Sequence, residues 1–347
     1  MAELRRFGDF ATFKYGKMPD KKKLTESGKY PVYSGYRYVG YYDEYNTEAN
    51  QIIVVARGVG GTGDVKLTKE RCYLTNLSIS ADIDENIALP EFIYYYYLQH
   101  NLRYLDSGSA QSQITISDLE KVMIPLPSLG EQRAICGYMK MLDRKIEINE
   151  AVNENLAQQA QAIYADMFIT NADPTWTMGH LSDLITVKYG KDHKKLDDGP
   201  YPVYGSGGIM RYVERPLYDK ESVLIPRKGT LNNVLYVNEP FWSVDTMFFT
   251  EMKRPNVAKY VYHFVKSKDL ASLNAGSAVP SMTTDILNAM ELLIPDTDSL
   301  SRFESIVAPM FLTMQQNTQE SSKLAETRDA LLPRLMSGEL DISALDI

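Results

Sequence analysis

The protein has 347 residues, a formal net charge of −8 at pH 7 and a hydrophobic fraction of 44%, values that predict a soluble chain of about two domains. No apolar run is long enough to span a membrane and the N-terminus shows no secretory pattern, so we expect a cytoplasmic protein. The two cysteines exclude a disulfide framework and a cysteine zinc site, and the acidic total argues against binding of polyanions through net charge alone.

Positive charge is concentrated in two stretches of this acidic chain. Residues 1–40 carry nine Lys and Arg against four acids, and residues 186–230 carry nine against six. Each stretch is consistent with an ordinary solvated surface or with a site for an anionic partner.

The sequence repeats itself. Four short stretches recur in the same order at offsets between 168 and 174. They are Lys-Tyr-Gly-Lys at 14 and 188, Tyr-Pro-Val-Tyr at 30 and 201, an apolar run followed by a basic residue and glycine at 52–58 and 223–229, and Gly-Ser-Ala at 108 and 276. This near-constant offset predicts an internal duplication.

Each copy begins with a mixed segment of strands and helices, at 1–128 and 171–298. The predicted elements are buried strands at Ile52–Ala56 and Val223–Ile225, and helices at Pro90–Leu102 and Val257–Leu270. The tyrosine run at 94–97 falls on the first of these helices and predicts core packing rather than a platform for stacking bases.

Each copy ends in a long predicted helix. Ser128 with Glu131, and Ser301 with Glu304, have the spacing of a capping box, and Gly338 is placed to end the second helix. Apolar residues then alternate in steps of four and three, as in a coiled coil. The seam positions are Ile135, Met139, Leu142, Ile146, Asn149, Asn153, Leu156, Ala160, Ile163 and Met167, then Phe303, Val307, Met310, Met314, Asn317, Ser321, Leu324, Arg328, Leu331 and Leu335.

Two similar halves in one chain usually pack about a pseudo-twofold axis, which makes the paired helices antiparallel. The predicted fold class is α+β, with two mixed α/β domains related by pseudo-twofold symmetry and joined by two long antiparallel coiled-coil helices. Symmetric pairing places Ile135 opposite Leu335, Met139 opposite Leu331, Ile146 opposite Leu324, Asn149 opposite Ser321, and Asn153 opposite Asn317. A helix of about 50 Å suits two readers of DNA half-sites roughly 34–36 Å apart.

Two stretches carry a family resemblance. Residues 124–135 read Ile-Pro-Leu-Pro-Ser-Leu-Gly-Glu-Gln-Arg-Ala-Ile, and residues 328–340 read Arg-Asp-Ala-Leu-Leu-Pro-Arg-Leu-Met-Ser-Gly-Glu-Leu. Both resemble the conserved regions of type I restriction-modification specificity subunits. The second copy departs from this pattern, because Ile294-Pro295 is not followed by Gly-Glu-Gln. The resemblance implies target-recognition domains at 1–128 and 171–298, spacer helices at 129–170 and 299–338, and a tail at 339–347.

The resemblance also implies a function. Each target-recognition domain would read one half of an asymmetric, bipartite site in double-stranded DNA. The spacer helices would dock two modification subunits carrying S-adenosylmethionine, and two restriction subunits would add ATP- and Mg²⁺-dependent translocation and cleavage. The chain itself would hold no cofactor, metal or catalytic residue and would contact no membrane.

Motifs for chemistry within this chain are weak. Residues 58–63 match Gly-x-Gly-x-x-Gly, but no amphipathic pattern follows to form the helix that a dinucleotide loop needs. Asp173-Pro174-Thr175-Trp176 lacks the second proline of an adenine methyltransferase motif. Asp20 and Asp64 are too far apart in sequence for a paired-carboxylate nuclease motif. The histidines lack metal-ligand spacing; they are His100, His180, His193 and His263.

Side-chain chemistry and predicted loop position indicate the candidate DNA contacts. Lysines contact phosphates, whereas Arg, Asn and Gln can pair with base edges. The phosphate candidates are Lys17, Lys21, Lys22, Lys191, Lys194 and Lys228. The base-reading candidates are Arg37, Arg57, Gln111, Gln113, Arg211, Asn232 and Asn233. Tyr15 and Tyr189 match between the copies and favour a scaffold or phosphate role, whereas unlike pairs such as Gln111 and Val279 favour sequence choice.

Two other readings remain open from the sequence. A coiled-coil adaptor with duplicated binding domains and no DNA specificity would show the same repeat and helices. A restriction or methylation enzyme would need a conventional catalytic motif.

Overall fold

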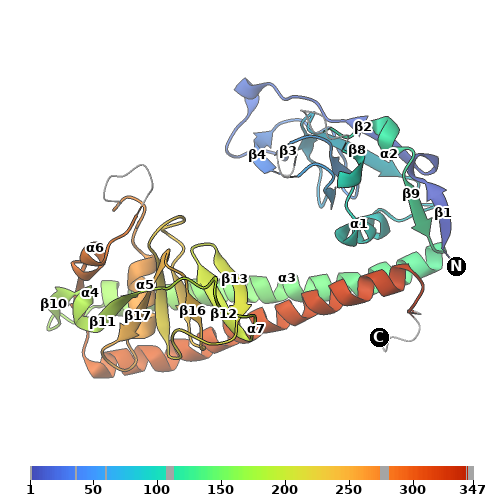
Figure 1. The fold of residues 1–347 in the computed structure, drawn as a ribbon. Coiled ribbons are helices and arrows are strands. Elements are labelled where there is room, and N and C mark those ends of the chain that lie inside the picture. Colours follow the sequence, from blue (N-terminus) through green and yellow to red (C-terminus); the bar gives the residue numbers. More distant parts are fainter. Residues whose placement is uncertain are drawn as a thin grey trace. The chain divides into compact units, whose positions relative to one another are not determined.

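The computed structural model describes residues 2–35, 37–58, 61–106, 113–273, 281–340 and 342. The chain forms two compact units: unit 1 comprises residues 1–149 with 318–347, and unit 2 comprises residues 150–317. Each unit holds one mixed domain and part of both long helices, α3 (Leu129–Ala165) and α7 (Thr297–Met336) (Figure 1). Within the described residues, no helix is both long and apolar enough to cross a membrane.

Unit 1 contains three small sheets. A four-stranded sheet has the order β2 (Ala11–Tyr15), β8 (Ser78–Ile83), β5 (Ile52–Val55), β6 (Val65–Leu67). A three-stranded sheet has the order β4 (Arg37–Tyr42), β3 (Tyr30–Ser34), β7 (Tyr73–Leu74), and β1 (Glu3–Arg6) pairs with β9 (Met123–Leu126). The helices of the mixed domain are α1 (Pro90–Gln99), α2 (Ile116–Leu119) and the 3-10 turns η1 (Phe7–Asp9), η2 (Lys21–Lys23) and η3 (Arg103–Leu105).

Unit 2 repeats this topology strand for strand. Its four-stranded sheet is β11 (Ile185–Tyr189), β17 (Met247–Met252), β14 (Ser222–Pro226), β15 (Leu235–Val237), and its three-stranded sheet is β13 (Gly208–Val213), β12 (Tyr201–Gly205), β16 (Trp242–Ser243). The remaining elements are the strand pair β10 (Thr177–His180) and β18 (Glu291–Ile294), the helices α4 (Leu181–Leu184), α5 (Ala258–Lys266) and α6 (Thr284–Asn288), and the π-helical turn η4 (Asp166–Thr170). The predicted duplication is therefore confirmed at the level of the fold.

The two faces of the four-stranded sheet of unit 1 have different neighbours, because alternate strand residues point to opposite sides. Ile52 and Val54 pack with α1 and with Ile135 of α3. Ile53, on the other face, packs against Leu74 of the three-stranded sheet. Helices, four-stranded sheet and three-stranded sheet thus form successive layers, and unit 2 has the same layering.

Burial also settles the role of the tyrosine run and of the cysteines. Tyr95 and Tyr97 of α1 are buried in the core, which confirms that this run packs rather than stacks on bases. Burial raises the pKa of Cys72 and Cys136 to about 12, so both thiols stay protonated and unreactive near neutral pH.

Hydrogen bonds within each unit show that α3 and α7 pair antiparallel. In unit 1, the Asn149 amide donates to Ser321 Oγ at 3.3 Å, and Arg328 Nη1 lies 2.8 Å from Asp143 Oδ1. In unit 2, the Asn317 amide donates to Asn153 Oδ1 at 2.8 Å. Residue numbers rise along one helix as they fall along the other, and each side chain of the predicted seam is buried or half-buried.

The helix ends follow the sequence in two places and depart from it in one. Ser128 and Glu131 form the expected reciprocal cap on α3, and Gly338 has a φ of +73° just after α7, as a helix-ending glycine should. The predicted cap at Ser301 is wrong, because α7 begins a turn earlier. Asp296 accepts hydrogen bonds from the Ser299 amide and from Trp176 Nε1, which lower its pKa to about 2.

Gln132 joins the start of α3 to the mixed domain of unit 1. Its buried amide accepts a hydrogen bond from the Leu89 backbone at 2.9 Å and donates to the carbonyls of Pro127 and Ile87. Leu300 is at the corresponding position of unit 2 and is buried in an apolar core. The second junction therefore holds by apolar packing, which explains why it can lack the Gly-Glu-Gln stretch.

A buried lysine joins α5 to α7 in unit 2. The side chain of Lys259 is 4% exposed, and its Nζ lies 2.9 Å from Glu221 Oε1 and 2.7 Å from Glu304 Oε1. The equivalent residue in α1 is an acid, Glu91, which pairs with Lys140 of α3 at 2.6 Å. The polarity of this helix-to-domain ion pair is thus reversed between the two units.

The helix register predicts a disulfide. With Cys72 and Cys136 replaced by alanine, Asn149→Cys combined with Ser321→Cys should crosslink on mild oxidation, because the native side chains are in contact. The readout is a reducible shift on a denaturing gel, confirmed by mass spectrometry. The control pair, Asn149→Cys with Lys323→Cys, uses an exposed position on α7 and should not crosslink; equal crosslinking of both pairs would contradict this register.

The buried lysine predicts a loss of stability. Lys259→Met should lower the free energy of unfolding by about 2–4 kcal/mol, because the carboxylates of Glu221 and Glu304 lose their partner. This loss is smaller than the roughly 3–5 kcal/mol typical of a fully buried pair, because the two carboxylates are 28% and 21% exposed. Lys69→Met, the control, removes an ion pair whose partners are both exposed, Lys69 at 85% and Glu147 at 57%, so it should cost under about 1 kcal/mol. Urea denaturation of the full chain measures both, and equal losses would disprove the assignment.

Candidate nucleic-acid interface

The sheet topology brings several predicted DNA-contacting residues to one corner of unit 1. β2 and β5 are each antiparallel to β8, which lies between them, so both strands end at the same edge of the sheet. Tyr15 is opposite Ile79, and Ile79 is opposite Val54. We call Tyr15, Lys17, Arg57 and Gln113 corner 1, and the equivalent Tyr189, Lys191, Lys228 and Ser281 of unit 2 corner 2.

Glycine allows the chain to leave β2 at this corner. A Cβ on Gly16 would lie 2.2 Å from the Thr75 carbonyl oxygen, so no larger residue fits. The Lys17 amide then bonds the Leu74 carbonyl at 2.9 Å, which places Lys17 at the sheet edge. Gly190 is just as crowded by Val244 in unit 2. The repeated Lys-Tyr-Gly-Lys motif is therefore first a structural device, and it positions a lysine at each corner.

Backbone pairing completes each corner. A β-bridge joins Arg57 to Gln113, and the equivalent bridge joins Lys228 to Ser281. The Tyr15 hydroxyl accepts a hydrogen bond from the Ile116 amide at 3.3 Å, at the start of α2. Each corner thus presents the same backbone frame with different side chains, Arg and Gln in one case and Lys and Ser in the other.

The β3–β4 hairpin reaches the same corner. A Cβ built on Gly35, which has a φ of +62°, would lie 3.6 Å from the Arg57 carbonyl oxygen, and Ser78 Oγ bonds the Gly35 carbonyl at 3.4 Å. In unit 2, the Asn233 amide donates to the Ser206 carbonyl at 2.8 Å, which ties the β12–β13 hairpin to the loop after β14.

The structure gives three predicted base readers partners inside unit 2. Arg211 Nη2 bonds Asp198 Oδ1 at 2.7 Å and the Leu196 carbonyl at 3.0 Å. Asn232 bonds Asp269 and the Ala271 amide, and Asn233 bonds Ser206 as described. Base reading by these residues would require breaking these bonds, so their assignment stays a prediction that the geometry does not favour.

The remaining candidates lie outside the corners or outside the described residues. Lys21 and Lys22 are exposed on η2, whose start is capped by Asp20. Lys194 is exposed beyond Lys191, and Arg37 begins β4 beside the hairpin tip. Gln111, Val279 and the Gly-Ser-Ala repeats lie outside the described residues.

Arg227 is a residue that the sequence comparison missed. Its guanidinium lies 5.4 Å from the centre of the Tyr189 ring, and its Nη1 donates to the Asp245 carbonyl at 3.1 Å. The repeat aligns it with Ala56, so only the local excess of positive charge in residues 186–230 could have pointed to it. A cation–π contact of this kind holds both side chains at corner 2.

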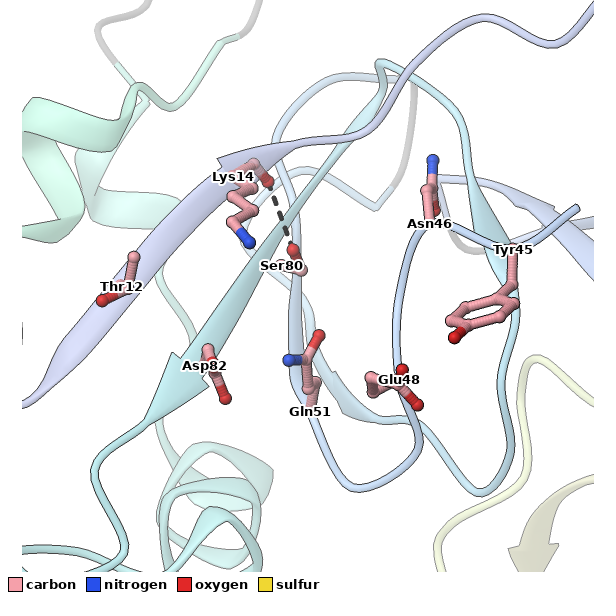
Figure 2. Close-up of a pocket in the computed structure, with 8 residues that line it drawn as sticks. All are labelled: Thr12, Lys14, Tyr45, Asn46, Glu48, Gln51, Ser80 and Asp82. Carbon is pink, nitrogen blue, oxygen red and sulfur yellow. Dashed lines mark hydrogen bonds between the residues drawn. The ribbon is translucent and has the colours of Figure 1, made fainter.

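A polar pocket of about 330 Å³ is present in unit 1 (Figure 2). It is lined by Thr12, Lys14, Tyr45, Asn46, Glu48, Gln51, Ser80 and Asp82. In unit 2, Phe249 is at the position of Ser80, opposite Lys188 in β11, and it is buried in an apolar cluster. A bulky apolar side chain thus replaces part of the polar lining in unit 2, so we do not expect a function common to both copies to use this pocket.

The described residues contain no set of three His, Cys, Asp or Glu side chains that could hold a metal ion. The Gly-x-Gly-x-x-Gly stretch leads into strand β6 rather than into a helix. A dinucleotide phosphate would therefore meet no helix N-terminus there.

Comparison with known proteins agrees with this fold. Residues 2–158 and 174–305 match the type I restriction modification DNA specificity domain. The chain is 26% identical over 355 residues to a candidate type I specificity subunit of Mycoplasma genitalium, covering 93% of this chain and 90% of the relative. It is 22% identical over 318 residues to the specificity subunit of the type I restriction enzyme MjaIX of Methanocaldococcus jannaschii, covering 78% and 74%. The crystal structure of a type I S subunit from M. genitalium superimposes with a TM-score of 0.70 at 22% identity, covering 96% and 95% of the two chains.

The chain belongs to the type I restriction-modification DNA specificity family, whose domain matches most of its length. Its function is that of a specificity subunit, which recognises DNA sequence for a type I restriction-modification system. Specificity subunits of this kind are generally non-catalytic.

The crowding at Gly16 predicts opposite effects of one substitution at two glycines. Gly16→Ala should lower the free energy of unfolding by about 1–3 kcal/mol, because the new Cβ overlaps a backbone carbonyl. Gly137→Ala, in open space on α3, should raise it by about 0.5–1 kcal/mol by removing a helix glycine. Urea denaturation of the two variants measures the difference. If Gly16→Ala were as stable as the wild-type protein, corner 1 would not be built as described.

Proposed function

We propose that this chain reads an asymmetric, bipartite DNA site, with corner 1 directed to one half and corner 2 to the other. The observation that carries this proposal is a common backbone frame with unlike side chains. Arg57 and Gln113 can pair with base edges bidentately, whereas Lys228 and Ser281 offer a point charge and a hydroxyl. Two readers of different chemistry select two different half-sites.

Phosphate contacts support the same proposal. Lys17 and Lys191 leave the sheet at equivalent positions, and Lys21 and Lys22 extend the positive charge beyond corner 1. Such contacts fix a protein on the duplex without selecting its sequence. The net charge of −8 opposes DNA, so we propose that partner subunits neutralise much of the phosphate charge.

The partners belong to the proposal as well. α3 and α7 would dock two modification subunits that carry S-adenosylmethionine, and two restriction subunits would supply ATP- and Mg²⁺-dependent cleavage. The chain would contribute recognition and no catalysis, and it would act in the cytoplasm. The family to which the chain belongs supports this division of labour.

Selection from a randomised duplex pool tests the proposal. The chain, assembled with its modification subunit, should enrich a motif of two defined blocks separated by undefined bases. Sequencing of the bound DNA gives the motif directly. Enrichment of no motif would support a scaffold without DNA specificity instead, and methyl transfer by the isolated chain would contradict a non-catalytic role.

Two substitutions separate base reading from phosphate contact. Arg57→Ala should change base preference in one block only, because corner 2 is intact. Lys17→Ala should weaken all duplexes alike and lower the slope of log affinity against log salt by about 1. Fluorescence anisotropy over a salt series measures both, with Lys121→Ala as control, because Lys121 is exposed and lies outside corner 1 and both long helices. The site assignment is wrong if both variants bind the enriched duplex as the wild-type complex does.

A further inference from the structure

Each unit exposes apolar side chains on the outer edge of one hairpin. We call β3 with β4 hairpin 1, and β12 with β13 hairpin 2. β4 and β13 are at the edges of their three-stranded sheets, which form the layer on the far side of the four-stranded sheet from the helices. The tip of each hairpin contacts the loop that follows β5 or β14, next to its corner.

A β-bulge recurs at the same place in both hairpins. In hairpin 1, Val32 is opposite Gly40 and Tyr33 is opposite Tyr38, so Val39 is the additional residue. In hairpin 2, Val203 is opposite Arg211 and Tyr204 is opposite Ile209, so Met210 is the additional residue. Bulges re-aim side chains next to functional sites, and here they turn Val39 and Met210 outward.

The outward side chains are apolar in both copies but differ in kind. Tyr38 is 50% and Val39 is 45% exposed, whereas Ile209 is 50% and Met210 is 59% exposed. An edge strand with exposed apolar residues favours aggregation unless something covers it. These positions are exposed and apolar in both units but are occupied by different residues. This pattern fits an equivalent binding surface in each unit, with a different specificity in each.

The positive charge of the chain segment that leads into hairpin 1 indicates which partner covers its apolar edge. Residues 14–37 carry seven Lys and Arg (14, 17, 21, 22, 23, 29 and 37) against two acids (20 and 26), in a chain whose net charge is −8. Residues 188–211 carry five (188, 191, 194, 195 and 211) against three (192, 197 and 198). An apolar hairpin edge in a chain segment with excess positive charge matches a DNA groove, where phosphates border base edges and thymine methyl groups.

The size of the hairpins and the neutral phenol of Tyr38 also fit a DNA groove. The major groove admits a two-stranded β-ribbon. The ordinary pKa of tyrosine, about 10, already keeps the Tyr38 phenol neutral at pH 7, and burial with a hydrogen bond to Tyr41 raises that pKa further. The phenol therefore adds no negative charge facing phosphate.

We propose that hairpins 1 and 2 enter the major groove of the two half-sites, where Tyr38 with Val39 and Ile209 with Met210 contact base edges, thymine methyl groups in particular. These residues would then determine part of the sequence of each half-site, beside the polar side chains of the corners. The inference rests on the proposed function, because it assigns residues to that recognition.

Single substitutions in the complete complex test the inference. Val39→Ser, assembled with the modification subunit, should alter the pool-selected motif at one or two positions in one block, and Met210→Ser should do so in the other block. Affinity for the wild-type motif should fall by roughly 5- to 100-fold, the range for one lost base contact. Deoxyuridine lacks the methyl group of thymine. Replacing thymine by deoxyuridine at those positions should therefore lower the affinity of the wild-type complex by a similar factor and leave unchanged the affinity of the variant whose substituted residue contacts that position.

Matched controls are available on another strand of each unit. Leu4 of β1 and Met178 of β10 are at equivalent positions, and each is 63% exposed. Leu4→Ser and Met178→Ser should leave the motif and the affinity unchanged.

The outcomes separate this inference from the function on which it rests. If the wild-type complex selects a bipartite motif and the hairpin variants select the same motif with equal affinity, the inference is overturned while the proposed function stands. If the hairpin variants lose the modification subunit but the wild-type complex tolerates deoxyuridine, the hairpins bind protein instead. If the wild-type complex selects no motif, the proposed function fails and the inference with it.

Discussion

The register of α3 against α7 depends on amide side chains near the middle of each helix. In unit 1, Asn149 bonds Ser321, and in unit 2, Asn153 bonds Asn317. A slip by one heptad would leave these polar groups among apolar side chains without their hydrogen bonds, which costs free energy. Leucine and methionine side chains in the seam have no hydrogen bonds to lose in such a slip. The apolar seam supplies the energy of pairing, whereas the amides select one alignment from several of similar apolar area.

Each mixed domain depends on that alignment, because its core is shared with the helices. Ile135 of α3 and Leu335 of α7 are buried in the core of unit 1 with α1, and Phe303 of α7 is buried in the core of unit 2 with α5. The helices are therefore part of both folding units rather than a linker between finished domains. The surfaces that differ between the copies lie away from this shared core. The corners are at the ends of strands of the four-stranded sheet, and the hairpins are in the layer on its far side.

The sequence was sufficient to predict the features that repeat along the chain. The repeat predicted two mixed domains of the same kind, and steps of four and three residues predicted the helix seam, because each depends on spacing alone; the order of the strands in the sheets was not predicted. It was not sufficient where two local signals competed: Asp296 caps α7 although Ser301 and Glu304 have the spacing of a capping box. Partners distant in sequence were also inaccessible, which is why Arg211 and Asn232 were assigned to bases although they bond within their own unit.

The reversed ion pairs limit how such a protein can diversify. Glu91 in α1 meets a lysine of α3, whereas Lys259 in α5 meets a glutamate of α7. A mixed domain moved by recombination from the first position to the second would bring a carboxylate against Glu304 in a poorly hydrated place, and like charges repel strongly there. Exchange of whole domains between homologous genes is thus easiest position for position, and a shuffle between positions would require a compensating change at residue 91 or 259.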